Sequence, residues 1–234
     1  MAERLQKVIA ARGVASRRAV EAMIEQGRVQ VNGHPAVLGM SVGPNDEILI
    51  DGQPLPEAPK LRYILLHKPR GYVTTLSDER GRRTVAELVA DCGERVHPVG
   101  RLDYDSEGLL LMTNDGALTQ RMTHPKHEID KIYNVRVKGY TDRGLNRLRE
   151  PMSLDGVRLR PAQVKLLEVQ GDRAAFEMTI HEGKNRQIRR MCEIAGMTVV
   201  RLRRIAEGPL ELGKLAPGKW RDLTAEERRA LGVR

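Results

Sequence analysis

Several charged residues stand directly before an apolar run in the middle of this sequence. The charged residues are Arg101, Asp103, Asp105 and Glu107. The run that follows, residues 109–112, has the composition of a buried strand. An ionised carboxylate beside a core is costly unless it is paired or hydrogen-bonded, and charged groups held in this way gather at functional sites. A solvated loop that caps a buried strand is the alternative interpretation.

Two of these carboxylates could also act as a pair. If residues 101–105 are extended, Asp103 and Asp105 share one face at a spacing of about 6.7 Å. This spacing falls in the range used by inverting glycoside hydrolases. Those enzymes usually hold sugars on several aromatic rings, whereas aromatic residues make up only 3% of this chain. A glycoside hydrolase is therefore the weaker enzyme hypothesis.

The charge of the chain indicates an anionic partner. Lys and Arg number 40 against 31 Asp and Glu, which gives a formal net charge of +9. A basic protein of this kind is suited to nucleic acid, although charge alone does not specify one. With one Phe and one Trp, the chain cannot build rows of rings that stack on bases. We therefore expect affinity to come mainly from Lys and Arg contacts to phosphates.

The sequence lacks the motifs of membrane proteins, nucleotide-binding proteins and metal-binding proteins. No apolar run of about 18 residues is present, so we expect a cytoplasmic protein with no membrane partner. No glycine-rich nucleotide fingerprint occurs, so we expect no nucleotide cofactor. Cys92 and Cys192 are interpreted as two reduced thiols. His124 and His127 lack further ligands at convincing positions, and we predict no metal site.

The N-terminal segment predicts two helices and short strands. The first helix ends near Gly13, and the second begins after the capping residue Ser16 and ends at Gly27. A short strand then alternates into the hairpin dipeptide Asn32-Gly33, and residues 48–50 form another strand. Four basic residues surround the second helix and suit an RNA backbone, with a solvated basic face as the alternative: Arg12, Arg17, Arg18 and Arg28.

A stiff connector separates this segment from the rest of the chain. Three prolines lie within residues 53–60, so we place an N-terminal domain at 1–58 and a second domain at 61–234. In the second domain, alternation and apolar spacing predict strands at 63–66, 131–138 and 174–180, and helices at 84–90, after Thr141, and before Gly196. The expected class is α+β with a mixed, mostly antiparallel sheet.

Two cations near the start of the last of these helices indicate a nearby anion. Lys184 and Arg186 fall near its N-terminus, where the helix dipole disfavours positive charge. Asp103 or an RNA phosphate could supply the compensating negative charge. A mobile surface cluster is the alternative.

Several blocks, in order, carry a resemblance to a known family. They are residues 67–73, 100–103 with 106–116, 123–125, 130–133 and 181–191. Together they resemble the family of ribosomal pseudouridine synthases that comprises the small-subunit and large-subunit types, and the large-subunit type is the closer match. The residues before the connector resemble the S4 RNA-binding module that precedes the catalytic domain in this family.

The resemblance implies roles for individual residues. Asp103 matches the catalytic aspartate, and Lys184 the basic residue that lies against it. Tyr133 matches the ring that packs on the target base, although a Tyr that alternates with two Val residues is more often a core residue. Ile188 matches an apolar pocket residue. The same blocks place Arg101, Arg186 and Gln187 at the substrate, where Arg101 either positions the nucleotide or fixes the Asp103 loop.

The implied reaction is the isomerisation of a uridine to pseudouridine in ribosomal RNA. The C1′–N1 bond breaks, the base turns, and C1′ joins C5, so no cofactor is needed. The base must leave its stack to react. Whether Asp103 attacks C1′ or removes a ribose proton stays open. The expected substrate is 23S rRNA and the expected state a monomer. The alternatives are 16S rRNA and a non-catalytic S4-type assembly protein.

Overall fold

The computed structural model describes residues 2–233 and contains two compact units. The smaller unit runs to Leu61 and includes Asn114–Gly116, and the larger comprises Arg62–Thr113 and the chain from Ala117 onward. Each unit has a hydrophobic core of its own. Within the described residues, no helix combines the length and apolar character needed to span a bilayer.

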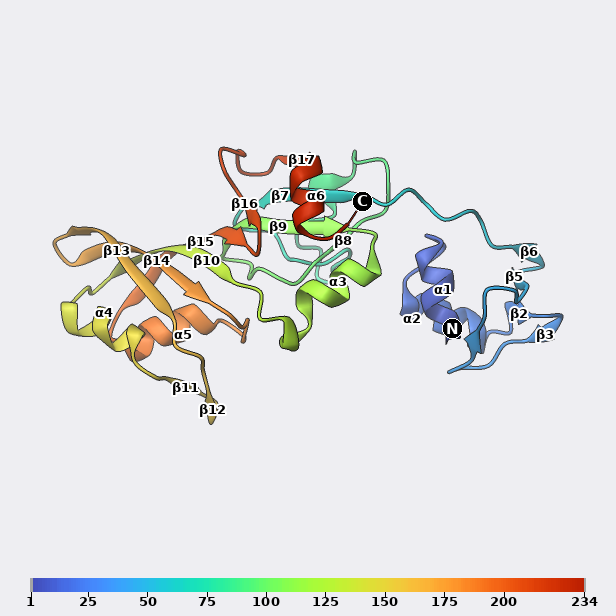
Figure 1. Cartoon of the computed structure of the whole chain (residues 1–234), viewed down its shortest axis with the longest axis horizontal. Helices are drawn as coiled ribbons and strands as arrows, with labels where there is room; N and C mark the ends of the chain where they lie inside the picture. Colours follow the sequence, from blue (N-terminus) through green and yellow to red (C-terminus); the bar gives the residue numbers. More distant parts are fainter. Residues whose placement is uncertain (1, 234) are drawn as a thin grey trace. The chain divides into compact units, whose positions relative to one another are not determined.

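Two helices followed by short strands build the smaller unit, as the sequence predicts (Figure 1). A two-residue strand, β1, also precedes the first helix and was not predicted. Ser16 caps the second helix, because its hydroxyl accepts a hydrogen bond from the Ala19 amide at 3.2 Å. Both helices bury their apolar face in one core. The elements are β1 (Glu3–Arg4), α1 (Leu5–Ala11), α2 (Arg17–Glu25), β2 (Val29–Val31), β3 (His34–Pro35), β4 (Ser41–Val42), β5 (Ile48–Ile50) and β6 (Gln53–Pro54).

Two tight turns order these strands. Asn32 and Gly33 adopt φ of 52° and 78°, and they join β2 to β3 as the predicted hairpin. Asp51 and Gly52 do the same between β5 and β6, with φ of 50° and 77°. The predicted connector is therefore wrong at its start. Gln53–Pro54 belongs to an edge strand paired with β5, and the irregular connector begins after it.

One mixed sheet organises the larger unit. Its strands follow the order β13-β14-β10-β15-β9-β7-β17, with β8 on β9 and β16 on β15. Among the described strands, β9 pairs with β15 in parallel and every other pairing is antiparallel, so the predicted class is confirmed. The bounds are β7 (Tyr63–Lys68), β8 (His97–Pro98), β9 (Glu107–Thr113), β10 (Lys131–Lys138), β13 (Gln163–Gln170), β14 (Arg173–Ile180), β15 (Thr198–Glu207), β16 (Leu210–Glu211) and β17 (Trp220–Asp222).

Short helices and one hairpin surround this sheet (Figure 1). They are η1 (Glu87–Val89), α3 (Gly116–Thr123), η2 (Pro125–His127), α4 (Asp142–Arg149), α5 (Gln187–Ile194), α6 (Ala225–Ala230), and the hairpin β11 (Ser153–Leu154) with β12 (Val157–Arg158). Thr141 caps α4, as its hydroxyl accepts from the Gly144 amide at 3.0 Å. The helix predicted at 84–90 is only the single 3₁₀ turn η1.

The apolar run is strand β9, and it is buried on both faces. Leu110 and Met112 pack into the core beneath α4 and α5, whereas Leu109 and Leu111 pack on the opposite side with the C-terminal segment. All four are fully buried. Burial on both sides explains why the run is continuous instead of alternating. The charged loop therefore leads directly into the middle of the domain.

Gly108 allows β9 to approach β15. It has φ of +115°, and a Cβ atom there would lie 2.2 Å from the carbonyl oxygen of Arg204. Only glycine fits so close a backbone contact. Residues 203–204 consequently pair with residues 107–108. This contact places the loop that carries Asp103 beside β15.

Candidate active site

The predicted catalytic and substrate residues of the larger unit line one pocket. The pocket has a volume of about 270 Å³. The predicted residues that line it are Arg101, Asp103, Tyr133, Lys184, Arg186, Gln187 and Ile188. Leu102, Ile180 and Leu202 add apolar walls. Residues that are far apart in the sequence are thus brought together by the β9–β15 contact and by α5.

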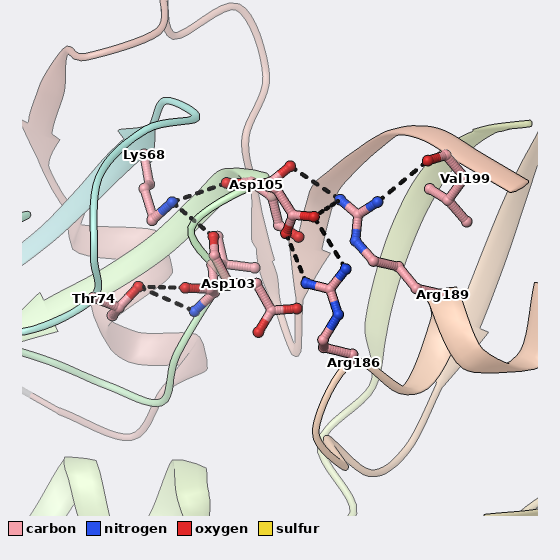
Figure 2. Close-up of polar contacts among 9 residues, drawn as sticks. Lys68, Thr74, Asp103, Asp105, Arg186, Arg189 and Val199 are labelled. Atoms are coloured by element: carbon pink, nitrogen blue, oxygen red, sulfur yellow. Dashed lines mark hydrogen bonds and ion pairs between the residues drawn. The ribbon is translucent and has the colours of Figure 1, made fainter.

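The side chains of Lys68 and Thr74 hold the backbone of the Asp103 loop (Figure 2). The hydroxyl of Thr74 donates to the carbonyl of Leu102 at 2.6 Å and accepts from the Leu102 amide at 3.3 Å. The ammonium of Lys68 donates to the carbonyls of Asp103 and Ser106 at 3.0 and 2.9 Å. The side chain of Asp103 is left to the pocket.

Lys68 is a fully buried cation that the sequence analysis did not single out. Burial lowers the pKa of its ammonium to about 8, against the opposing attraction of Asp103, Asp105 and Glu107. Lys68 lies in the 67–73 motif block, but the pattern did not show that its side chain reaches the loop that carries Asp103. Thr74 directly follows the same block and was missed for the same reason.

Arg186 and Arg189, at the start of α5, bind Asp105 and not Asp103 (Figure 2). Arg186 forms a two-point contact with the Asp105 carboxylate, at 3.2 Å for each pair of atoms. Arg189 lies 3.3 Å from the same carboxylate and donates to the Asp105 carbonyl at 3.0 Å. Burial acts to raise the pKa of Asp105, but the Arg186 hydrogen bond and the Arg189 charge outweigh it and the pKa is lowered.

The anion expected at the start of α5 is therefore Asp105. Arg186 is the N-cap residue of α5 in a left-handed conformation, with φ of 48°. Lys184 lines the pocket, but within residues 2–233 its ammonium forms no ion pair with Asp103. Its amide instead donates to the side chain of Gln187 at 3.0 Å. The ion pairs of this loop thus join Asp105 to Arg186 and Arg189, and the role expected for Lys184 beside Asp103 stays a prediction.

Tyr133 lines the pocket from β10. It is buried, and burial raises the pKa of its phenol against the opposing effect of Arg204, which hydrogen-bonds to it. Arg204 is itself fully buried, donates to the Leu109 carbonyl at 2.8 Å and lies 3.2 Å from Glu207. The hydrogen bond from Arg204 thus fixes the position of the phenol. The sequence analysis missed it because it stands in an alternating strand that otherwise looks like ordinary core.

Arg101 is exposed at the pocket. The sequence left two roles open, fixing the Asp103 loop or positioning the nucleotide. Hydrogen bonds to the loop backbone come from the side chains of Lys68, Thr74 and Arg189 and from the Gly71 amide. Because Arg101 is not among these donors, contact with the nucleotide is the favoured role for Arg101.

The basic residues predicted for RNA binding in the smaller unit are all exposed. Arg17 and Arg18 occupy the first turn of α2. Arg28 forms an ion pair with Asp51 at 2.6 Å, and Arg12 donates to the Pro56 carbonyl at 3.2 Å. Arg17 and Arg18 are therefore the better placed of the four to contact a phosphate.

The two histidines weighed as metal ligands lie in one turn. The rings of His124 and His127 meet edge to face, with centroids 5.8 Å apart. Over the described part of the chain, no group of three or more His, Cys, Asp or Glu side chains is arranged to hold a metal ion.

Two domain families match this chain. An RNA pseudouridylate synthase domain matches residues 62–194, and an S4 domain matches residues 3–48. A crystal structure of a pseudouridylate synthase shares the fold with a TM-score of 0.69 and 31% identity, covering 97% of this chain and 99% of its own. The fold and the pocket thus define an RNA-modifying isomerase with an S4 module.

Curated relatives extend over nearly the whole chain. An uncharacterised RNA pseudouridine synthase of Aquifex aeolicus is 43% identical over 97% of this chain and 92% of its own length. Ribosomal large subunit pseudouridine synthase B of Bacillus subtilis is 43% identical over 98% of this chain and 95% of its own. The chain belongs to the RNA pseudouridine synthase family.

Proposed function

We propose that this chain converts a uridine of 23S ribosomal RNA to pseudouridine, with Asp103 as the catalytic carboxylate. The observation that carries the proposal is the placement of Asp103 beside Tyr133 and Ile188 in one pocket of the synthase domain. The choice of 23S rRNA is supported by the similarity to large-subunit enzymes of Bacillus subtilis and Pseudomonas aeruginosa. We further propose that the protein acts as a monomer in the cytoplasm.

The pocket is suited to one extruded nucleotide. Its volume of about 270 Å³ lies just below the range that drug-sized ligands occupy. Ile188 and Leu202 offer apolar contacts for the flat base, and the ring of Tyr133 also lines the pocket. A uridine inside a stack cannot present its glycosidic bond to Asp103, so the base must flip out of the RNA.

Each step of the reaction has a group to perform it. The Asp103 carboxylate acts on the ribose as the C1′–N1 bond breaks. The detached uracil stays between Ile188 and Tyr133 while it turns to present C5 to C1′. After the new bond forms, the C5 proton leaves and a proton is gained at N1, so the product is an isomer of the substrate. We assign Tyr133 to assist that proton transfer, and its hydrogen bond from Arg204, which fixes the phenol, supports this role.

The cations around the pocket position the RNA. Arg101 and Lys184 line the pocket without an ion pair in the described structure. Both have the charge to contact phosphates on either side of the flipped nucleotide. Arg186 is already engaged by Asp105 and stabilises the loop as well.

The decisive test replaces Asp103 by Asn in the full-length protein. Pseudouridines are mapped in 23S and 16S rRNA from cells that carry the wild type, Asp103→Asn or no copy of the gene. One 23S signal should vanish in the last two cases, while the purified variant still binds rRNA. Asp172→Asn, an exposed change of the same kind, should leave the signal intact. A persistent signal in Asp103→Asn cells would exclude the role given to Asp103, and loss of a 16S signal would exclude the proposed substrate.

A further inference from the structure

A second hollow lies outside the active-site pocket, and arginines line it. Its volume is about 280 Å³. We name it the arginine groove and define it by Arg70, Arg136, Arg173 and Arg201. Glu168 is the acidic residue among those that line it. The pocket that holds Asp103 shares none of these residues.

The groove occupies the face of the sheet opposite to α4 and α5. Val135 and Phe176 point into the core that these helices cover. Side chains of a strand alternate between the two faces, so Arg136 on β10 and Arg173 on β14 point to the other side. That side leaves Arg136 and Arg173 exposed to solvent.

The strand register sets like charges directly opposite each other. Arg136 is the cross-strand partner of Arg201, and Lys138 is the cross-strand partner of Arg173. Directly opposed like charges destabilise a sheet. The two pairs are adjacent on the same face, since Arg136 and Lys138 are two residues apart on β10. The sheet therefore concentrates positive charge at a cost to its own stability.

Few acidic groups offset this charge. Arg201 pairs with Glu107 at 2.7 Å. For the residues that the structure describes, neither Arg136 nor Arg173 forms an ion pair, and the same holds for Arg70. Three guanidinium groups thus face one hollow with their donors available. A guanidinium presents a planar fork of donors that matches the oxygens of a phosphate.

We propose that the arginine groove is a second RNA-binding site, which holds the phosphodiester backbone of substrate RNA away from the target uridine. It adjoins the catalytic loop, because Glu107, the partner of Arg201, lies two residues after Asp105. A concave site lined by guanidinium forks suits discrete phosphate groups, and the domain belongs to a family that acts on RNA. The site would anchor RNA on the far face of the sheet and leave the pocket free for one nucleotide.

The test compares two double variants of the full chain that remove equal charge. Arg136→Gln/Arg173→Gln removes two guanidinium groups, and their positive charge, from the groove. Arg143→Gln/Arg158→Gln removes two exposed arginines from α4 and β12. Affinity for 23S and 16S rRNA transcripts is measured between 50 and 200 mM salt, and turnover is measured at saturating RNA.

We expect the groove variant to lose affinity about tenfold and the slope of log affinity against log salt to fall by about 2, as for two lost phosphate contacts. Turnover at saturating RNA should not change. The control variant should keep the wild-type slope. If the groove double variant does not fold, Arg70→Gln, on the loop after β7, provides the same test with a slope change of about 1.

Two results would overturn the inference. One is a groove variant that binds rRNA like the control. The other is unchanged rRNA binding with lost binding to anionic lipid vesicles, which would assign the groove to a membrane surface. The inference rests on ribosomal RNA as the substrate, but binding is scored separately from modification. A wild type that modifies neither transcript would therefore count against the proposed function, while the binding comparison still tests the groove.

Discussion

The buried ammonium of Lys68 donates a hydrogen bond to the backbone carbonyl of Asp103, with an Nζ–O distance of 3.0 Å. It also donates to the carbonyls of Ser106 and Pro69, at 2.9 and 3.2 Å. One cation thus donates three hydrogen bonds, two to the Asp103 loop and one to the loop after β7. The proposed catalytic carboxylate is positioned through its backbone, and its side-chain oxygens stay available to the substrate.

Replacing Lys68 by Met should lower turnover more than it weakens RNA binding. The variant keeps the apolar length of the side chain but leaves three carbonyls without their donor. Each unsatisfied buried group costs about 1–3 kcal/mol, and removal of a buried charge offsets part of that. Single-turnover kinetics should show a lower rate at saturating RNA, with an unchanged dissociation constant.

Lys214→Met is the matched control, because Lys214 is exposed. It should keep the wild-type rate and thermal midpoint. A Lys68→Met variant with a wild-type rate would show that the loop holds Asp103 without this cation.

The titration of Lys68 should change how the unfolding free energy depends on pH. Its pKa is about 8 in the folded chain, against 10.5 for an ordinary lysine. Between these values the unfolded chain binds more protons, so the contribution of Lys68 to the unfolding free energy rises with pH. Below pH 8 both states are protonated and the contribution is flat. The difference in unfolding free energy between wild type and Lys68→Met should therefore increase from pH 8 to 10.5, as measured by urea titration.

Activity should move in the opposite direction over the same window. A neutral amine has two N–H donors, which cannot satisfy three carbonyls. Turnover of the wild type should decline above pH 8, and Lys68→Met should lack that part of the pH profile. Parallel profiles for the two proteins would assign the decline to another group.

Asp105→Asn should destabilise the synthase domain more than Asp155→Asn does. Asp105 binds Arg186 and the nearly buried Arg189, whereas Asp155 binds Arg190 at the exposed surface. Loss of a hydrogen bond to a charged group costs about 1.5–3 kcal/mol, and an exposed pair contributes about 0–1 kcal/mol. Urea denaturation of both variants measures the difference. Equal losses would mean that the Asp105 contacts do not stabilise the fold.

Gly108→Ala should prevent β9 from pairing with β15. The added Cβ would lie 2.2 Å from the Arg204 carbonyl oxygen, at φ of +115°. Positive φ alone costs a residue other than glycine about 1–3 kcal/mol, and the backbone clash adds to it. Gly171→Ala, with φ of +58° and open space around it, isolates the conformational part. We expect insoluble or strongly destabilised Gly108→Ala protein and a soluble Gly171→Ala protein, judged by yield and thermal midpoint.

The sequence predicts the fold class and most of the pocket because both depend on local patterns. Alternation identifies β10 and β14, and the motif blocks mark Asp103, Tyr133 and Ile188. The sequence does not predict which carboxylate pairs with the arginines. Asp103 and Asp105 are equivalent in an extended strand, and only the loop geometry decides that Asp105 receives the arginines.

The roles of Lys68 and Arg204 could not be predicted, because they depend on long-range contacts. Lys68 and Arg204 stand in apolar or alternating strands, and their roles depend on carbonyls 35 or more positions away. The start of the connector was misplaced because a Pro-rich segment can also supply an edge strand, as Gln53–Pro54 does. Such a pairing depends on β5, and composition alone gives no sign of it.

Arg136→Gln should stabilise the protein at low salt while it weakens RNA binding. Arg136 and Arg201 are directly opposed across β10 and β15, and relief of such a contact is worth about 0.2–1 kcal/mol. Salt screens the repulsion, so the gain should shrink between 20 and 300 mM salt. Arg143→Gln removes the same charge from the exposed side of α4 and controls for net charge. Thermal unfolding at the two salt concentrations measures the effect. A loss of stability at both concentrations would show that Arg136 supports the sheet, and charge concentration would then no longer explain its position.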